Sequence, residues 1–526
     1  MKQSSFFRGE MLGGVLVLKA AVARTNLYGF FASSRRSVMD GILNLDAISL
    51  SRAIESKKIS CEELMKCTLD RIDDVNPRCN AIVLLRDRND LMEDARSADQ
   101  NDRRGWLHGI PTAIKDVSNA NGIPTTMGGS QLSKNFVPNF NDFYVENMVK
   151  AGAIIIGKTN SPENGLGSHT YNERWGATLN PFDLTKSAGG SSGGAGVAVS
   201  SRMLCVADGT DMMGSLRNPA GWNNIYSHRP TAGMIRGAPA SKKNPLPYPT
   251  STVGPMARTP MDCAMLLETM AGKNNFDAHL VLDKELSLET TRIGWLGDWG
   301  RQLPFEDGVL DICRFALGHL EERGVAVDVI TEEIFPLEKL WTSWNSIRFG
   351  TVAALFSQSS YSLDILLGSK SPIKEELQWE IKQGLQISDK ELLQAKIICD
   401  EYAEHLETLF GTYDILALPS AQLFPFPKDW KWPKEVGGTP MDTYHRWMQV
   451  CVPVTLGGLP CSTIPAGFGE NGLPLGIQLF TRRGGDAKTL LLAQAYHRIV
   501  DWPSNIKPSE DDDSLLSCCA DMYARN

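Results

Sequence analysis

The sequence predicts an α/β fold: a single large α/β/α domain with a central mixed β-sheet flanked by helices. Three observations support this prediction. Short apolar runs bounded by Gly, Pro or Asp recur along the chain, and segments of helix length separate them. The composition, 42% hydrophobic and 22% charged, is that of a globular protein. The 526 residues are enough for one very large domain, and no repeat period is visible.

The first predicted helix follows Ser60, which forms a capping box with Glu63 ahead of an amphipathic stretch that continues to about Val75. Two later segments, 307–323 and 388–410, also have helical periodicity. The second of them opens on another Ser-x-x-Glu capping box.

Six apolar runs are predicted to be strands buried on both faces, because each is short and continuous and ends at turn-forming residues. They are residues 110–114, 153–157, 204–207, 293–296, 325–330 and 415–418. A further segment, 421–438, is rich in Pro, Trp and Phe and is predicted to be an ordered surface loop near a pocket.

The two ends of the chain differ from the rest. Residues 1–38 contain serines, aromatics and a single acid, Glu10, which is the composition of an organellar transit peptide. The alternative is that Met39 begins the functional chain and the leader is an upstream extension. We therefore expect a leader over 1–38, the main domain over 39–505 and an acidic tail over 506–526. The basic residues of the leader are Lys2, Arg8, Lys19, Arg24, Arg35 and Arg36.

Charge and cysteine usage limit the partners and the compartment. A net charge of −8 and a pI near 5.6 argue against a nucleic-acid partner. The eleven cysteines are scattered without a C-x-x-C pair, so neither a metal site nor a disulfide framework is expected. The odd count favours a reducing compartment, hence a cytoplasmic protein, or a mitochondrial one if the leader is a transit peptide. The apolar stretch 11–23 is shorter than the roughly 20 residues of a transmembrane helix, and none is expected.

A glycine-rich segment, SAGGSSGGAG at 187–196, leads into small residues at 197–201 that are predicted to begin a helix. It lacks both the Walker lysine and the G-x-G-x-x-G spacing, which argues against a phosphate cradle. A linker would not be placed between a loop and a helix in this way. The segment is therefore interpreted as part of a rigid site.

A second turn follows the predicted strand 204–207, where residues 208–215 break the strand and Leu216 begins a helix. Ser215 lies in this turn, where a serine is well placed for nucleophilic attack. Backbone N–H groups in such a turn can converge on an oxyanion. The candidate oxyanion donors are the amides of Met212, Met213 and Gly214.

A serine nucleophile needs a base. No histidine lies in the glycine-rich segments, and His108 and His169 are predicted to be structural. Lys115 follows the predicted strand 110–114, where burial would remove solvent from its ammonium form and lower its pKa toward neutrality. A neutral lysine is a competent base.

Together these segments closely resemble the amidase signature family, whose members carry G-x-P-x-x-x-K-D, then G-G-S-S-G-G, then T-D-x-G-G-S-[IL]-R. The matching residues here are 109–116, 189–194 and 210–217. The resemblance covers roughly residues 40–500, and segments 180–183, 217–220 and 472–478 also match the family pattern.

The resemblance implies a Ser–cis-Ser–Lys triad, with Ser215 as nucleophile, Ser191 as bridging serine after a cis peptide bond, and Lys115 as base. No metal and no organic cofactor is required. Asp211 and Arg217 are expected to brace the nucleophile turn as a charge pair, the alternative being a solvated surface pair. The supporting residues implied by the motifs are Gly190, Ser192, Thr210, Asp211 and Arg217.

Three positions depart from the family pattern. Met213 stands where the family has Gly, His228 replaces a residue that is usually Leu or Phe, and Thr455 occupies a position where many members carry Asn. These departures bear on efficiency and substrate choice, while the three triad positions are intact.

The leading hypothesis is a stand-alone amidase, a monomer or homodimer that hydrolyses a small linear carboxylic amide to an acid and ammonia or an amine. The aromatic stretches 341–349 and 423–432 suit an aryl, acyl or short-chain amide, or equally a core cluster. Three alternatives stay open: the A-type subunit of a glutamyl-tRNA amidotransferase, an ester or carbamate hydrolase, and a binding protein with a decayed site.

Overall fold

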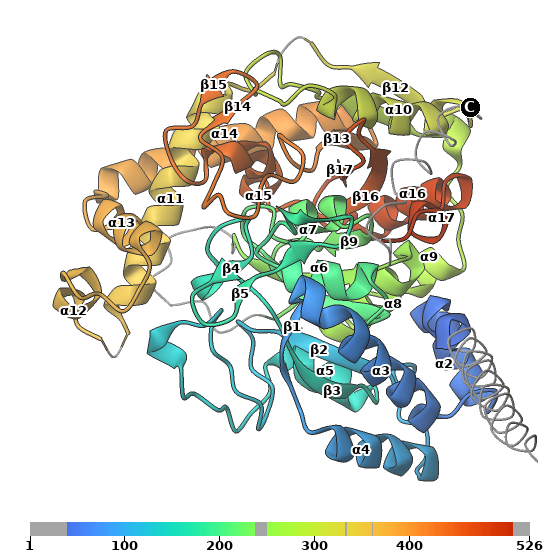
Figure 1. The fold of residues 1–526 in the computed structure, drawn as a ribbon. Coiled ribbons are helices and arrows are strands. Elements are labelled where there is room, and N and C mark those ends of the chain that lie inside the picture. The colour runs from blue at the N-terminus through green and yellow to red at the C-terminus, as the bar shows by residue number, and fades with distance from the viewer. Residues whose placement is uncertain (1–38, 237–249, 332–333, 360, 509–526) are drawn as a thin grey trace, which may run out of the picture.

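A computed structural model describes residues 39–236, 250–331, 334–359 and 361–508 (Figure 1). The predicted leader and all but the first three residues of the predicted tail lie outside the described residues. The main sheet has eight strands in the order β12-β11-β13-β17-β16-β9-β10-β8, and a smaller sheet has the order β1-β3-β2. Both parallel and antiparallel pairs occur in each sheet, so the predicted mixed α/β architecture is confirmed.

The strands of the two sheets are short and mostly buried. In the small sheet they are β1 Ile82–Leu85, β2 Pro111–Lys115 and β3 Ile154–Thr159. In the main sheet they are β8 Val206–Asp211, β9 Tyr226–Arg229, β10 Thr252–Ala257, β11 Arg292–Trp295, β12 Ala326–Val329, β13 Ile415–Pro419, β16 Cys461–Phe468 and β17 Pro474–Phe480. Three two-stranded pairs are β4 Tyr171–Asn172 with β5 Gly176–Ala177, β6 Leu179–Asn180 with β7 Asp183–Ser187, and β14 Glu435–Val436 with β15 Thr439–Pro440.

Helices surround the sheets. Those in the N-terminal half are α2 Ala47–Glu55, α3 Cys61–Cys79, α4 Arg88–Gln100, α5 Phe143–Lys150, α6 Gly193–Ser200, α7 Arg217–Trp222, α8 Pro260–Ala271 and α9 His279–Leu282. The later ones are α10 Val309–Glu321, α11 Leu337–Ser357, α12 Leu363–Leu367, α13 Glu375–Gly384, α14 Asp389–Thr412, α15 Val452–Leu456, α16 Asp486–Ile499 and α17 Trp502–Asn505. Short 3-10 turns are η1 Gln131–Ser133, η2 Glu163–Gly165, η3 Leu288–Thr290 and η4 Arg446–Cys451.

The three helices predicted from their periodicity are all present, as α3, α10 and α14. The two predicted capping boxes also form: Ser60 and Ser388 each accept a hydrogen bond from the backbone N–H three residues on, and the glutamate there bonds back. Helix α3 extends past the predicted end at Val75 because Arg78 and Cys79 continue its last turn before Asn80 ends it in a left-handed conformation.

Every predicted strand is present, but two details are wrong. The strand predicted over 204–207 runs on to Asp211, because β10 pairs with β8 along its whole length, from Ala257 opposite Val206 to Thr252 opposite Asp211. The strand predicted over 325–330 is not buried on both faces, because β12 is the edge of the main sheet and Val329 is 58% exposed.

The segment 421–438 is irregular as far as β14, as predicted, but its first part is not at the surface. Leu423, Phe424 and Phe426 are buried, because Trp222 donates its indole N–H to the carbonyl of Leu423 and packs edge-on against Phe426. The segment therefore closes the core beside α7.

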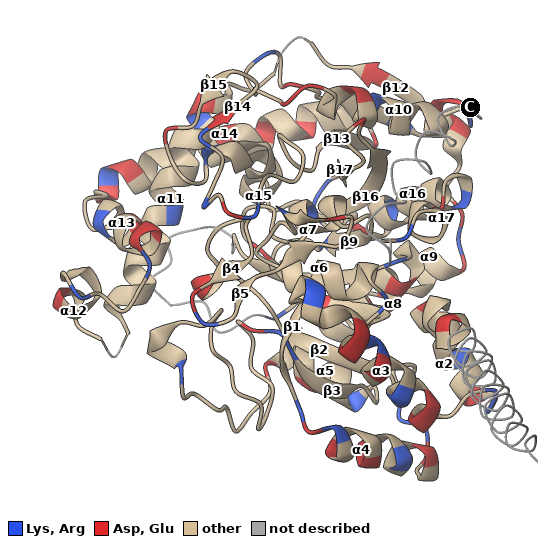
Figure 2. Ribbon diagram, in the orientation of Figure 1, with Lys and Arg blue, Asp and Glu red and all other residues tan. Residues whose placement is uncertain are grey.

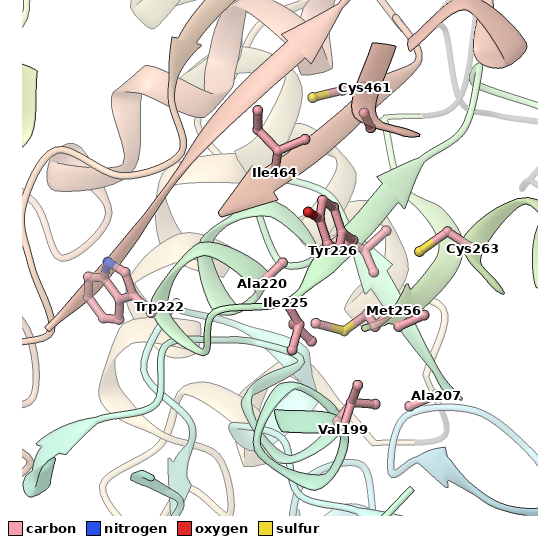
Figure 3. Packing of buried hydrophobic residues seen from close by; sticks show 14 of the residues in the cluster. Val199, Ala207, Ala220, Trp222, Ile225, Tyr226, Met256, Cys263, Cys461 and Ile464 are labelled. Atoms are coloured by element: carbon pink, nitrogen blue, oxygen red, sulfur yellow. The ribbon is translucent and has the colours of Figure 1, made fainter. Parts of the chain in front are cut away.

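The core lies between α6, α7 and the strands of the main sheet (Figure 3). Val199 of α6 and Ala220 of α7 are fully buried, as are Met256 of β10 and Ile464 of β16. Helix α6 contains only Gly, Ala, Val and Ser and is buried on every side. Its small side chains let it sit closely against the strands that carry the candidate site.

Charges of both signs alternate along the outer helices, as α3 and α4 show in Figure 2. Arg88 of α4, for example, pairs with Asp70 and Asp73 of α3. No helix among the described residues is both long enough and apolar enough to cross a membrane.

Candidate active site

Lys115, the last residue of β2, is fully buried, and its amine is surrounded by hydroxyl groups. Its Nζ is 2.7 Å from Ser191 Oγ, 2.8 Å from Ser192 Oγ and 2.8 Å from Thr210 Oγ1. A neutral amine has two N–H bonds and one lone pair, so it can donate to two hydroxyls and accept from one. Ser192 also donates its own proton to the carbonyl of Thr210, at 3.3 Å, and so accepts from Lys115. Ser191 and Thr210 remain as the hydroxyls that can donate to the amine.

Burial lowers the pKa of Lys115 from its ordinary value to about 7, and the negative charges of Asp208 and Asp211 oppose this effect. Desolvation disfavours the ammonium form because its charge loses water. Near neutral pH the amine therefore exists in both the protonated and the neutral form, as a general base requires.

The glycine-rich segment forms a tight loop at the start of α6, and the peptide bond between Gly190 and Ser191 is cis. The helix begins at Gly193, four residues before the predicted start at Val197, inside the glycine run. At Gly194 a Cβ would lie 2.4 Å from the backbone nitrogen of Asn160 and 2.5 Å from the carbonyl oxygen of Ala81. The close approach of these backbones explains why position 194 is glycine.

Ser215 lies in the turn between β8 and α7 and is 8% exposed. Its carbonyl accepts a hydrogen bond from the N–H of Ser192 at 3.3 Å, which fixes the two serine-bearing turns to each other. Among the described residues, Ser215 Oγ makes no hydrogen bond. The hydrogen bond between Ser191 and Ser215 that a proton relay needs is therefore not formed in this arrangement. Lys115, Ser191 and Ser192 are joined directly, and Ser215 is joined to them through its backbone.

The backbone amides of the nucleophile turn divide into two kinds. Gly214 N–H donates to Asp211 Oδ1 at 3.0 Å, so in this arrangement it has an acceptor already. The N–H groups of Met212, Met213 and Ser215 have no acceptor within the described part of the chain. Met213, which stands in place of a family glycine, is buried. Its backbone N–H is still present, as it would be in glycine.

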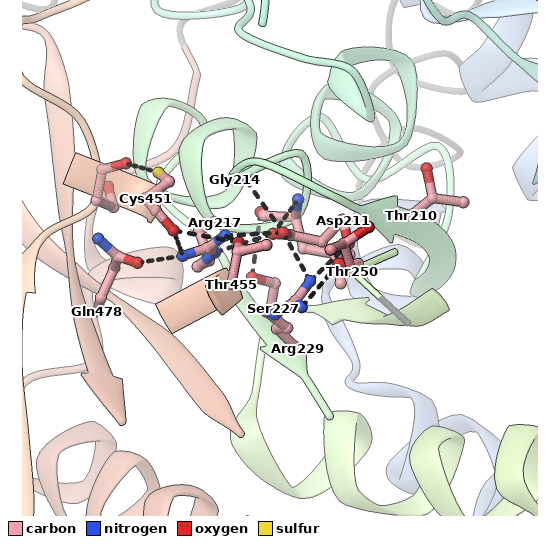
Figure 4. A network of polar contacts seen from close by, with 12 residues as sticks. Thr210, Asp211, Gly214, Arg217, Ser227, Arg229, Thr250, Cys451, Thr455 and Gln478 are labelled. Atoms are coloured by element: carbon pink, nitrogen blue, oxygen red, sulfur yellow. Dashed lines mark hydrogen bonds and ion pairs between the residues drawn. The ribbon is translucent and has the colours of Figure 1, made fainter. Parts of the chain in front are cut away.

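A buried ionic cluster holds this turn (Figure 4). Arg217 Nη2 and Nε lie 2.8 and 3.0 Å from the two oxygens of Asp211, and Arg229 Nη1 lies 3.0 Å from Oδ1; all three side chains are fully buried. The two guanidinium groups hold the pKa of Asp211 well below its usual range against the effect of burial. The pair is therefore not a solvated surface pair, and one carboxylate between two arginines leaves a net positive charge beside Ser215.

Arg217 also connects the turn to the C-terminal part of the chain. Its Nη1 donates to Gln478 Oε1 at 2.6 Å and to the carbonyl of Cys451 at 2.9 Å, and its Nη2 donates to Thr455 Oγ1 at 2.9 Å. Thr455, one of the departures from the family pattern, thus supplies an acceptor to this buried arginine. The match at 472–478 has a structural role at Gln478, on β17.

The histidines play structural roles. His108 accepts a hydrogen bond from the N–H of Arg104, and its other ring nitrogen lies 3.0 Å from the carbonyl of Ala98. His169 bridges Ser187 and the carbonyl of Lys428. His228, the third departure, is buried on β9, where its Nε2 lies 3.1 Å from the carboxylate of Asp486 at the start of α16. The described residues contain no group of three or more His, Cys, Asp and Glu side chains placed to bind a metal ion.

The two aromatic stretches, 341–349 and 423–432, pack against other rings of the core. Trp222 stacks on Trp447 at a ring separation of 6.0 Å, and Phe426 meets both rings edge-on. Trp341 lies 4.9 Å from the ring of His445. These contacts are those of core packing, so the composition of the two stretches carries no information on the substrate.

Two residues of the site have no signal in the sequence. Arg229 lies at the end of β9, and Asp208 lies inside a segment that resembles a turn. Both act through buried contacts with residues distant in the chain, which a linear pattern does not reveal.

Comparison with known proteins gives a consistent result. A family model described as Amidase matches residues 63–490. An acylamidase of Rhodococcus erythropolis is 29% identical over 480 residues, covering 89% of this chain and 97% of its own. The A-type subunit of the glutamyl-tRNA(Gln) amidotransferase of Ralstonia nicotianae is 31% identical over 503 residues, covering 86% and 97%. The crystal structure of a bacterial aryl acylamidase of the amidase signature family has a TM-score of 0.79 at 25% identity, covering 89% of this chain and 99% of that one.

Proposed function

The chain belongs to the amidase family, whose signature motifs it carries, and on that premise we propose that it hydrolyses a carboxylic amide through an acyl-enzyme on Ser215. Ser191 and Lys115 form the proton relay to this nucleophile. The observation that carries the proposal is the contact of 2.7 Å between Lys115 Nζ and Ser191 Oγ, made by a fully buried amine whose pKa lies at about 7.

In the acylation step, Ser215 Oγ bonds to the amide carbonyl carbon while its proton passes to Ser191 and the proton of Ser191 passes to Lys115. The C–N bond then breaks, and the amine leaves with the proton that Lys115 returns through Ser191. Water then gives a proton to the same relay and adds to the ester carbon. The bond to Ser215 Oγ breaks, Ser215 regains that proton, and the acid leaves. The step requires Ser215 Oγ to turn toward Ser191, a rotation about one side-chain bond.

The negative charge that develops on the carbonyl oxygen needs donors fixed before the reaction. The free N–H groups of Met212, Met213 and Ser215 surround the nucleophile and support this role. The net positive charge of the cluster made by Asp211, Arg217 and Arg229 adds to the same stabilisation.

A stand-alone amidase acting on a small linear acyl amide is the function that we favour, because an acylamidase and an aryl acylamidase are among the relatives. Related ester or carbamate hydrolysis would use the same acyl-enzyme. The second candidate is one component of an amidotransferase, which is favoured by several relatives of that name at 30–31% identity. Strict dependence of glutaminase activity on a co-purifying protein would select this candidate.

The test is hydrolysis of a panel of acyl and aryl amides by the purified chain and by its Ser215→Ala and Lys115→Met variants. We expect both variants to lose at least about a hundred-fold in kcat/KM, the effect of removing a nucleophile or a general base. Ser504→Ala, at an exposed position on α17, is the matched control and is expected to be fully active. Undiminished turnover by Ser215→Ala would remove the proposed mechanism.

A further inference from the structure

Asp208 is a buried carboxylate next to the base, and the relay described above does not use it. It lies on β8, is 0% exposed, and accepts two hydrogen bonds. Its Oδ1 takes the backbone N–H of Lys115 at 3.0 Å, and its Oδ2 takes the hydroxyl of Tyr144 at 2.7 Å. Tyr144, on α5, is itself buried.

The position of Asp208 follows from the way the two sheets meet. Strand β8 pairs with β10 on one side, and β2 of the small sheet lies on the other side without joining the ladder. Thr112 Oγ1 donates across this boundary to the carbonyl of Val206 at 3.2 Å. The carboxylate of Asp208 makes the next contact along it, directly at the residue that bears the catalytic amine.

The other charged groups near Lys115 have polar partners of their own. Asp211 is held by two arginines. Asp116 accepts from Thr126 and from the N–H of Gly128. Lys158, on β3, donates to Thr125 Oγ1 and to the carbonyl of Ser118. On the α6 side, Lys115 meets only the hydroxyls of Ser191 and Ser192. Within the described part of the chain, Asp208 forms no ion pair. Burial raises the pKa of its carboxyl group, and in its ionised form its charge favours the ammonium forms of Lys115 and Lys158.

We propose that Asp208 is a positioning residue for the base. Its carboxylate fixes the backbone of Lys115 at the boundary between the sheets, and its negative charge stabilises the ammonium that Lys115 becomes when it takes the proton of Ser191. This inference rests on the proposed function. Without the charge of Asp208, the buried amine of Lys115 would hold a proton less well and would be a weaker base.

The test is the pH dependence of kcat/KM for the wild-type chain and for Asp208→Asn. The asparagine keeps an acceptor for the N–H of Lys115 and removes the charge. Because the charge of Asp208 favours the ammonium form, its loss should move the acid limb of the profile to lower pH by roughly one unit. The plateau should fall several-fold because the base is weaker.

Tyr144→Phe is the matched control, since it removes one hydrogen bond from the same carboxylate and leaves its charge. Its acid limb should stay at or above that of the wild type. Asp208→Ser removes the charge with a smaller acceptor and completes the test if the asparagine variant does not fold.

A purely structural role would lower the plateau of the Asp208 variants and leave their acid limb in place, and this result would overturn the proposal. A limb that moves equally in Tyr144→Phe would also overturn it, because the hydrogen bond rather than the charge would then be responsible. Failure of the proposed function itself is recognised separately, by persistent activity of Ser215→Ala and Lys115→Met.

Discussion

In the proposed mechanism, Lys115 sets the pH at which the site can react. Below its pKa of about 7 the side chain is an ammonium with no lone pair, and above it the amine can accept a proton. We therefore expect kcat/KM to rise about ten-fold per pH unit below neutrality and to level off above it. Steady-state kinetics across this range will check the expectation. Lys115→Arg should be inactive at every pH, since a guanidinium stays protonated, and a profile that is flat through neutral pH would contradict the role of Lys115.

Gly214 shows how closely the nucleophile turn is constrained. Its φ is +88°, and a Cβ there would lie 2.4 Å from Cys451 Sγ. Gly214→Ala should therefore lower the free energy of unfolding by about 1–3 kcal/mol. It should raise the activation free energy of hydrolysis by more than this amount, because Ser215 is the next residue. Denaturant unfolding and kinetics measure the two effects. Adding Cys451→Ala removes the contact with Sγ but leaves the Cβ of residue 451 at 3.1 Å and the backbone strain, so we expect partial recovery of stability. Full recovery would show that the backbone conformation costs nothing.

Single residues also show what the sequence can and cannot predict. The positions of Lys115, Ser191 and Ser215 could be predicted because each lies in a local motif with glycines around it. Arg229 and Asp208 could not, because their partners are 18 and 93 positions away along the chain. The hydrogen bond that occupies Gly214 N–H was missed for a related reason, since it depends on where the side chain of Asp211 turns.

At the scale of elements, Arg217 joins the first turn of α7 to α15 and β17. Replacing it with Met would leave Asp211 with one guanidinium and would leave Gln478 Oε1 without its donor. We expect a loss of about 3–5 kcal/mol in the free energy of unfolding, the cost of breaking a buried ion pair on one side. Guanidinium unfolding measures it.

The matched control is Arg498→Met on α16, whose ion pair with Glu285 is exposed on both sides. Such surface pairs contribute about 0–1 kcal/mol. Equal losses in the two variants would show that the cluster around Asp211 does not hold the turn.

Elements with strong local signals were predicted correctly, but the sequence yields no prediction of how the strands pair. Helical periodicity, two capping boxes and the apolar runs predict α3, α10, α14 and six strands. No pattern marked β9 and β10, which are short and contain polar or small residues. Yet β10 extends β8 to Asp211, and β9 carries Arg229. Tertiary pairing therefore decides the geometry of the nucleophile turn.

At the scale of the whole molecule, the cysteines report on the intactness of the core. Eight of the nine described cysteines are buried, and none of the nine forms a disulfide. Burial raises the pKa of Cys79 and Cys451 to about 11, so their thiols are protonated at neutral pH as well as inaccessible. We expect these eight thiols to resist a thiol-specific reagent in the native protein and all eleven to react after denaturation.

A variant with Cys518 and Cys519 replaced by serine is the control, because these two residues lie outside the described part of the chain. In its native state, this variant should have at most two fewer reactive thiols than the wild type. Rapid reaction of more than three thiols in the native protein would show that the core opens far more readily than its packing indicates.

The proposed base and the proposed nucleophile belong to different sheets. Lys115 ends a strand of the three-stranded sheet, and Ser215 follows a strand of the eight-stranded one. Hydrogen bonds between a side chain and the backbone, rather than a strand ladder, connect β2 to β8. A small displacement of β2 relative to β8 would separate Lys115 from Ser191 and Ser192 while both sheets remained folded. On heating, turnover should consequently fade at a lower temperature than the calorimetric melt.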